Sequence, residues 1–159
     1  MSETSPGLFT FTPKWSRMVA PIVYFARAVD GLDRVDVLAA AQVVAAELQE
    51  SGLQMTDPVE VWTRAVPGIA ATDDPTLLVQ SDLGLLRRCD GVLMDMSIPD
   101  RNYIGCTCEL TYAYLWRIPS VVWVGDTGLD QRPWLRYHAT VVVHSRQEAI
   151  EAVAALLLG

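Results

Sequence analysis

The chain has 159 residues, of which 51% are hydrophobic, so it has the size of one domain and enough apolar side chains for one core. Its net charge of −7, from 19 acidic and 12 basic side chains, argues against binding to nucleic-acid polymers, which requires basic patches. A single nucleotide stays compatible with this charge, because backbone N–H groups and one or two local donors suffice to hold its phosphate.

Three features indicate a cytoplasmic protein without a membrane partner. The N-terminus lacks the charged start and following apolar run of a secretory signal. No apolar run approaches the roughly 18–20 residues that span a bilayer. The cysteines Cys89, Cys106 and Cys108 are an odd number, so they cannot all pair within the chain, and a reducing compartment suits them.

Strand-like and helical patterns alternate along most of the chain. Residues 1–17 show no sustained period and are expected to form an arm before a single α/β domain, residues 18–159. Apolar runs of strand length predict strands over residues 20–28, 53–56, 91–96, 119–124 and 138–144. Helical patterns cover residues 35–50, 76–88, 105–117 and 147–158. Asp33 precedes the first of these helices and Gly52 follows it, as expected for its two ends. The three prolines of residues 57–75 predict a functional loop or a hidden short helix.

Five strands separated by helices predict one doubly wound α/β domain, flavodoxin-like or Rossmann-like, with helices on both faces of a parallel sheet. The expected strand order is 2-1-3-4-5. The nearly continuous apolar strands agree, because strands buried on both faces lose the alternating pattern. Neither a Walker A motif nor a G-x-G-x-x-G after the first strand is present, so we expect no ATP hydrolysis and no cofactor.

In such a sheet, ligands bind outside the carboxyl ends of the strands where the strand order reverses. For the expected order this point lies between the first and third strands. Residues 25–32 and 96–109 should line it, and the segment after the second strand, with Trp62 and Arg64, should fold over it.

Three acidic residues map to this region. Glu109 follows the start of a predicted helix, which stabilises a carboxylate by about 0.3–1 kcal/mol, so it is expected to stay ionised. The alternative is a carboxylate that serves only the helix dipole. Asp82 lies on the apolar stripe of a predicted helix. A carboxyl group there has a raised pKa, has a partner, or faces a pocket. The alternative is that Asp82 lies at the edge of the stripe and reaches solvent. Asp95, near the end of a strand, points at the crevice or caps the following turn.

The remaining polar residues predict no metal site. His138 and His144 flank the last predicted strand without further ligands at metal spacing. Cys106 and Cys108 lie two apart on a helix, do not face the same side, and are interpreted as packing residues. The helix over residues 105–117 is apolar on nearly every side, which predicts a homo-oligomer, a dimer or a larger assembly.

Four stretches in chain order resemble the nucleoside 2-deoxyribosyltransferase superfamily, which includes the nucleoside 5′-monophosphate N-glycosidases. They read Y-F-x-x-A over residues 24–28, D-L-x-x-L-x-x-C-D-G-V over 82–92, G-x-x-x-E-L-x-x-A-Y over 105–114 and I-P-S-V-V-W-V-G-D over 118–126. Each motif is short, but their order and spacing around a parallel sheet make the set moderately specific.

The resemblance implies a role for each matching residue. Glu109 falls on the nucleophile that forms a glycosyl-enzyme ester, Asp82 on the aspartate that contacts the base and helps protonate it, and Tyr24 on the tyrosine that orients the glutamate. Asp95 falls near the base or sugar. The crevice adds further substrate-binding candidates, which are Phe25, Arg27, Ser97, Gly105 and Trp62.

The function that follows is transfer of the sugar of a (deoxy)nucleoside to another base. A hydrolase of nucleoside 5′-monophosphates with the same residues is the alternative, which phosphate donors around Arg27, Ser97 and Arg101 would favour. The segment RAVDGLDR, residues 27–34, lacks the serine- and glycine-rich phosphate cradle of those hydrolases, although Arg27 and Gly31 could partly replace it. A non-catalytic nucleotide sensor is a third hypothesis, from another functional class.

Overall fold

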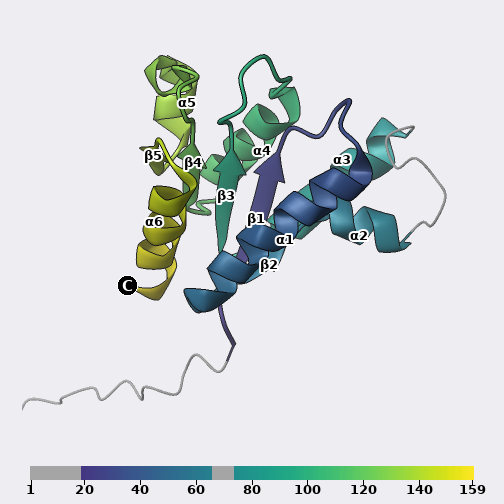
Figure 1. Ribbon diagram of the computed structural model, residues 1–159, viewed down its shortest axis with the longest axis horizontal. Helices are drawn as coiled ribbons and strands as arrows, with labels where there is room; N and C mark the ends of the chain where they lie inside the picture. The colour runs from purple at the N-terminus through teal and green to yellow at the C-terminus, as the bar shows by residue number, and fades with distance from the viewer. Residues whose placement is uncertain (1–18, 66–73) are drawn as a thin grey trace, which may run out of the picture.

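The computed structural model describes residues 19–65 and 74–159, whose five strands form one parallel sheet (Figure 1). The strands are β1 (Ile22–Arg27), β2 (Gln54–Thr56), β3 (Gly91–Asp95), β4 (Ser120–Trp123) and β5 (Val141–Val143). Their order is β2-β1-β3-β4-β5, and every neighbouring pair is parallel. The predicted doubly wound sheet is therefore confirmed, whereas the expected arm, residues 1–17, lies outside the described residues.

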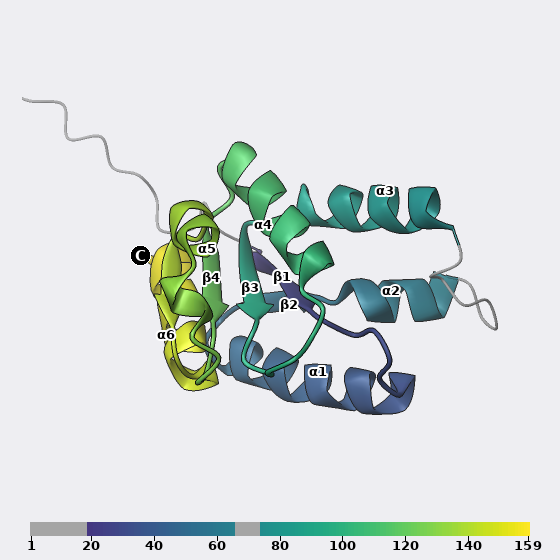
Figure 2. The same cartoon turned by 90° about the horizontal axis from the view of Figure 1, so that it is seen from above.

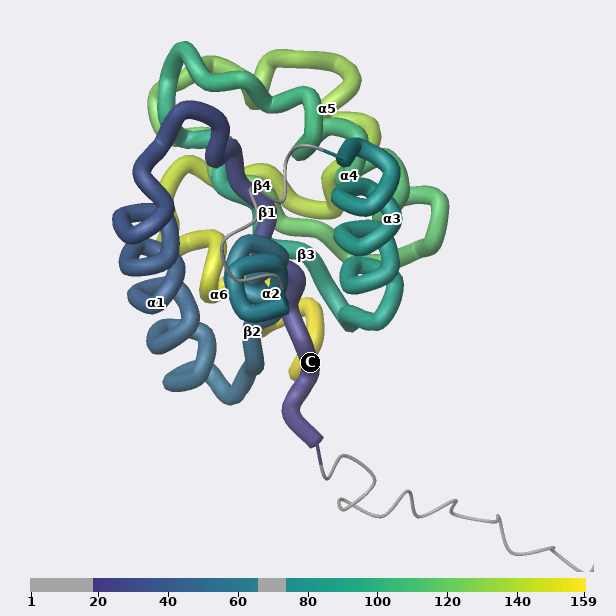
Figure 3. Tube along the Cα trace, turned by 90° about the vertical axis from the view of Figure 1, so that its right-hand side faces the viewer, coloured from purple at the N-terminus to yellow at the C-terminus, as the bar shows by residue number. Residues whose placement is uncertain are grey.

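Helices cover both faces of this sheet. They are α1 (Arg34–Glu50) and α6 (Arg146–Leu158) on one face, and α3 (Pro75–Leu86), α4 (Ile104–Leu115) and α5 (Pro133–His138) on the other (Figure 2). The helix α2 (Pro58–Ala65) lies between α1 and α3, as Figure 3 also shows, and the 3-10 helix η1 (Leu129–Gln131) precedes α5. None of the helices in the described part of the chain is long and apolar enough to cross a membrane.

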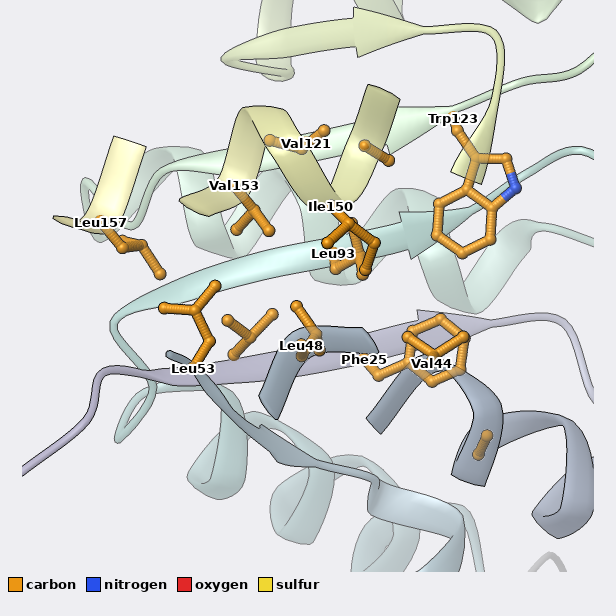
Figure 4. Close-up of a cluster of buried hydrophobic side chains, with 13 residues drawn as sticks. Phe25, Val44, Leu48, Leu53, Leu93, Val121, Trp123, Ile150, Val153 and Leu157 are labelled. Carbon is orange, nitrogen blue, oxygen red and sulfur yellow. The ribbon is translucent and has the colours of Figure 1, made fainter. Parts of the chain in front are cut away.

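Alternate residues of β1 enter two separate apolar clusters, because successive side chains of a strand point to opposite faces. Val23 and Phe25 join the cluster beneath α1 and α6 (Figure 4), where the rings of Phe25 and Trp123 lie parallel with centroids 6.1 Å apart. Tyr24 and Ala26 join the cluster beneath α3, α4 and α5. Burial on both faces explains why the strands read as continuous apolar runs.

Side-chain caps determine where three of the long helices begin. Asp33 accepts the N–H of Val35 at 2.9 Å before α1, and Asp74 accepts the N–H of Thr76 at 2.9 Å before α3. Ser145 begins α6 with a capping box. Each helix starts one residue before its predicted start, because the first helical residue after each cap is an arginine or a proline outside the apolar pattern.

Two segments refine the prediction. The strand expected over residues 138–144 is wrong at its start: His138 ends α5, its Nδ1 lying 2.7 Å from the carbonyl oxygen of Trp134, so the chain is still helical there and β5 begins only at Val141. Residues 57–75 contain α2, which is the short helix that the prediction named as the alternative to a loop.

Candidate active site

A cavity of about 460 Å³ lies at the carboxyl end of β1, where the strand order reverses between β1 and β3. Residues of β1, α1, α2, α3 and α4 surround it. Six of the residues predicted from the sequence line it together, which are Phe25, Arg27, Trp62, Asp82, Gly105 and Glu109. The fold thus gathers polar groups that are far apart in the sequence into one concave site.

Glu109 is held in this cavity by Tyr24. The Tyr24 side chain on β1 is fully buried, and its hydroxyl donates to Oε1 of Glu109 on α4 at 2.7 Å. Burial, and after it the charge of Glu109, raises the pKa of Tyr24 above its ordinary value, so the hydroxyl keeps its proton and remains a donor. Among the described residues, Oε2 of Glu109 has no hydrogen-bond partner, which leaves that oxygen available to a ligand.

The protonation of Glu109 differs from the prediction. Burial raises its pKa from 4.5 to about 7; the hydrogen bond from Tyr24 and the charge of Arg27 lower the pKa, and the charge of Asp82 raises it. Glu109 lies in the second turn of α4, and the field of a helix end falls off within the first turn. The expectation that the helix start keeps Glu109 ionised is therefore wrong: Tyr24 and Arg27 favour the carboxylate, against the effect of burial.

Asp82 has both a partner and a place in the cavity. The indole Nε1 of Trp62, on α2, donates to Oδ1 of Asp82, on α3, at 3.1 Å. Burial raises the pKa of Asp82 from 3.8 to about 6, the Trp62 hydrogen bond lowers it, and the charge of Asp57 raises it. Asp82 is half-buried, and the apolar stripe of α3 places its carboxyl toward the cavity.

Arg27 is engaged by a carboxylate that the sequence interpretation did not single out. Its guanidinium donates to both carboxylate oxygens of Asp57, at 2.8 and 2.9 Å, and Asp57 is only 2% exposed. Asp57 also accepts the N–H of Val59 and so caps α2. A signal for this cap is present in the sequence, since Asp57 is followed by Pro58 at the first helical position and by Glu60 three residues on.

Asp95 and Ser97 lie away from the carboxyl pair. Oδ1 of Asp95 accepts the backbone N–H of Ser97 at 2.9 Å and its hydroxyl at 2.6 Å, so Asp95 caps the turn after β3. Asp95 lines a second cavity of about 320 Å³, which Arg101 and Tyr103 also line. The two cavities adjoin along β1, but the structure does not bring Asp95 and Ser97 into the first one.

The cysteines and histidines form no metal centre. Within residues 19–65 and 74–159, no group of three or more His, Cys, Asp or Glu side chains is placed to hold a metal ion. Cys106 is buried at the cavity wall, whereas Cys108 is exposed, so the interpretation of both as packing residues is wrong for Cys108. Residues two apart on a helix point to different sides, which accounts for the difference.

Solved structures provide the comparison that decides the fold, since no family model matches the chain and no curated protein matches it. The 2-deoxyribosyltransferase of Bacillus psychrosaccharolyticus is 16% identical over 84% of this chain and 95% of that chain, with a TM-score of 0.62. The enzyme of Leishmania mexicana is 14% identical over 85% and 97%, with a TM-score of 0.63. The CMP N-glycosidase of Clostridium botulinum is 12% identical over 84% and 98%, with a TM-score of 0.54.

The chain has the fold of the 2-deoxyribosyltransferases. At these identities the likeness concerns the fold, so the roles assigned to Glu109, Asp82 and Tyr24 stay predictions. The geometry of the cavity adds one chemical property, which is the sharing of a proton by two carboxyl groups. Two carboxyl groups with pKa values of about 7 and about 6 share one cavity, so between these values they hold one proton between them. Such a pair supplies one carboxylate and one carboxylic acid at the same time. Because Glu109 has the higher pKa, the more populated singly protonated form has the proton on Glu109.

Proposed function

We propose that the protein cleaves the N-glycosidic bond of a (deoxy)nucleoside and transfers the sugar to a second base. The observation that carries this proposal is the hydrogen bond from Tyr24 to Glu109, at 2.7 Å, in the cavity that Asp82 also lines. It leaves one oxygen of a partly buried carboxylate directed to the ligand, with a second carboxyl nearby to act as acid. The likeness in fold to two 2-deoxyribosyltransferases supports the same reaction class.

The reaction consists of two displacements at the anomeric carbon. The first starts from the less populated singly protonated form, in which Glu109 is ionised and Asp82 holds the proton. Oε2 of Glu109 attacks C1′, the C1′–N bond breaks, and its electron pair leaves with the base, which takes a proton from Asp82. In the second, a nitrogen of the acceptor base attacks C1′ and displaces the Glu109 carboxylate, while the acceptor's proton passes to Asp82. Tyr24 stays hydrogen-bonded to Oε1 throughout, and both carboxyl groups return to their starting forms.

The partners of two predicted phosphate donors favour a free nucleoside as the substrate. The guanidinium of Arg27 is bonded to both oxygens of Asp57, and the hydroxyl of Ser97 donates to Asp95. A phosphate at either place would have to displace a carboxylate of the protein. These two side chains are therefore poor anchors for a 5′-phosphate.

A hydrolase of nucleoside 5′-monophosphates is the second candidate, because of Arg34. This exposed residue begins α1 and lines the first cavity, and it forms no ion pair within the described part of the chain. The likeness in fold to the CMP N-glycosidase of Clostridium botulinum supports this candidate. In the hydrolase, water takes the place of the acceptor base in the second displacement.

Release of free base distinguishes these functions. The protein is incubated with nucleosides and their 5′-monophosphates, with and without a second free base, and the products are separated by chromatography beside Glu109→Ala. New nucleoside formed only with an acceptor supports the transferase, whereas base and sugar phosphate formed from monophosphates alone support the hydrolase. Tight ligand binding without base release by either protein would contradict both and favour a nucleotide sensor.

We also propose a homo-oligomer in the cytoplasm. Ile104 and Leu115 of α4 are 70% and 64% exposed, and Trp134 of α5 is 77% exposed, so an apolar surface on this face of the sheet is left uncovered within one chain. The three free thiols support a reducing compartment. Light scattering after size-exclusion chromatography tests the assembly, and a mass of 17.5 kDa, that of one chain, would contradict it.

A further inference from the structure

The Trp62 indole holds one oxygen of the Asp82 carboxyl group. Its Nε1 donates to Oδ1 of Asp82 at 3.1 Å, from α2 to α3, which lie side by side (Figure 2). Among the described residues, Oδ2 of Asp82 has no hydrogen-bond partner. Both side chains line the first cavity. One oxygen of this carboxyl group is therefore engaged within the protein, whereas the other is available to a ligand.

The start of α2 fixes the place from which the indole donates. The Asp57 carboxylate is 2% exposed and accepts the N–H of Val59 at 3.0 Å, which caps the helix. The guanidinium of Arg27, at the end of β1, donates to both carboxylate oxygens of Asp57 at 2.8 and 2.9 Å. Trp62 follows Pro58 by about one helical turn. The indole thus extends to Asp82 from a helix that is anchored to the sheet.

The cavity wall around this contact is apolar. Pro58 and Val59 of α2 and Leu78 of α3 line the cavity beside Trp62 and Asp82. None of these three side chains can donate or accept a hydrogen bond. Of the side chains named here, only the indole can therefore distinguish the two oxygens of Asp82 from each other.

The indole N–H determines which oxygen of Asp82 carries the proton when this residue is the acid. An indole is a donor only, and a protonated carboxyl group has one O–H donor and one carbonyl oxygen, which is its better acceptor. The N–H at Oδ1 therefore favours the form in which Oδ1 is the carbonyl oxygen and Oδ2 carries the proton. A proton on Oδ1 would weaken the hydrogen bond to Trp62 in a half-buried place.

We propose that Trp62 is a positioning residue that keeps the proton of Asp82 on Oδ2, the oxygen open to the leaving base. The inference rests on the proposed function for the role of Asp82 as the acid. As the C1′–N bond breaks, a nitrogen of the base takes the proton, and the electron pair of the O–H bond stays on Oδ2. The proton of the acceptor base returns to the same oxygen in the second displacement. Trp62 itself exchanges no proton.

The same hydrogen bond stabilises the carboxylate that this proton transfer produces. Burial raises the pKa of Asp82 to about 6, the hydrogen bond from Trp62 lowers that pKa, and the charge of Asp57 raises it. The charge of Asp82 in turn raises the pKa values of Glu109 on α4 and Tyr24 on β1. Of these interactions, only the indole hydrogen bond favours release of the proton by Asp82.

The variant Trp62→Phe removes the N–H but keeps an aromatic ring in the cavity wall. Because acid catalysis contributes about 10²–10⁴-fold, loss of its orientation should lower kcat for base release from an unmodified deoxynucleoside about tenfold, at unchanged KM. A base methylated at a ring nitrogen carries a fixed positive charge and leaves without taking a proton. For a deoxynucleoside of such a base, kcat of the variant should equal that of the wild type.

Two further variants serve as controls. Trp134→Phe is the same substitution on α5, at a side chain that is 77% exposed and lines neither cavity, and it should leave kcat unchanged with both substrates. Asp82→Asn keeps an acceptor for the indole at the place of Oδ1 but has no proton to give. It should lower kcat with the unmodified substrate at least as much as Trp62→Phe does.

The closing experiment adds an NMR titration to these kinetic measurements. It follows the indole N–H resonance of Trp62 against pH in the wild type and in Asp82→Asn. We expect the resonance to shift with a midpoint near pH 6, the pKa of Asp82, and this shift to be absent from Asp82→Asn. The titration requires neither a substrate nor a variant of Trp62.

Each outcome supports or overturns the inference. An indole resonance that does not follow the titration of Asp82 overturns it, because the hydrogen bond is then absent. A Trp62→Phe variant that loses kcat equally with both substrates also overturns it, since a disturbed cavity explains that loss, and so does an unchanged kcat with both. Absence of base release by the wild type contradicts the proposed function alone, because the resonance still decides whether the indole holds Asp82.

Discussion

The two faces of the sheet use the same strands for different purposes. Beneath α1 and α6, the buried cluster around Leu93 and Phe25 contains apolar side chains only (Figure 4). On the other face, the apolar cluster includes the Tyr24 ring, whose hydroxyl meets Glu109 near the cavity of Asp82. The first face stabilises the fold by burial, whereas the second holds carboxyl groups whose burial costs free energy. Stability and chemistry are therefore separable by mutation.

The largest effect is expected for Glu109→Gln, which removes the carboxylate that we propose as the nucleophile but keeps an acceptor for the Tyr24 hydroxyl. Loss of the attacking carboxylate should lower kcat for base release by about 10³-fold or more. Chromatographic product assays measure this loss, and binding of a nucleoside by calorimetry serves as the control for an intact cavity. A variant that retains more than about a tenth of the activity would contradict the assignment of Glu109.

Leu93→Ala tests the opposite face. Leu93 is fully buried in the cluster beneath α1 and α6, so the cavity left by the substitution should lower the free energy of unfolding by about 2–5 kcal/mol. Denaturant unfolding measures the change. Activity per folded molecule should stay near that of the wild type, and a large loss of kcat in the folded variant would show that the two faces are coupled.

Tyr24→Phe removes only the hydroxyl that holds Glu109. Because hydrogen bonds to charged groups contribute about 1.5–3 kcal/mol, kcat should fall roughly 10- to 100-fold. The wild-type profile of activity against pH should be bell-shaped, with its maximum between the carboxyl pKa values of about 6 and about 7. Glu109 has the higher of the two pKa values and sets the alkaline limb, and the hydroxyl lowers that pKa, so the alkaline limb of the variant should move to higher pH. An unmoved limb would argue against this contact.

The smallest effect concerns the stability of Glu109→Gln. The folded-state pKa of Glu109, about 7, lies above the value of 4.5 for an unperturbed glutamate, so the fold loses stability as the pH rises from 4.5 to 7, and the whole loss is present above pH 7. The variant should be more stable than the wild type by about 1–3 kcal/mol at alkaline pH, and the difference should vanish below pH 4.5. Thermal unfolding across this range measures it; a difference independent of pH would assign the effect to packing.

The fold was predictable because its strands are buried on both faces. Continuous apolar runs such as that of β1, separated by capped helices, lead to a parallel sheet with few alternatives. α2 was harder to predict, since its Trp62 and Arg64 lie in a short helix whose start depends on Asp57. Eight residues are too few for a helical period to stand out.

Which residues line the cavity was predictable in part, since six of the predicted residues line it but Asp95 and Ser97 do not, and the electrostatics of the site were less predictable. The positions of Glu109 and Asp82 on two helices identified the carboxyl pair, together with the family resemblance. The partners of Arg27 and Asp95 could not be read from the sequence, because both depend on which groups the folded chain brings within hydrogen-bond distance. Burial also depends on the folded chain, so the sequence could not show that burial raises the pKa of Glu109 by more than the helix start lowers it.

The exposed thiol of Cys108 has a practical consequence. Cys89 and Cys106 are buried, and burial raises the pKa of Cys89 to about 11 and that of Cys106 well above its usual range, so both react slowly with alkylating reagents at neutral pH. Cys108 lies on the same side of α4 as Ile104. A fluorophore attached there would be a single-site probe, and its quenching on dilution or mixing would report subunit association without a reporter in the cavity that Glu109 and Asp82 line.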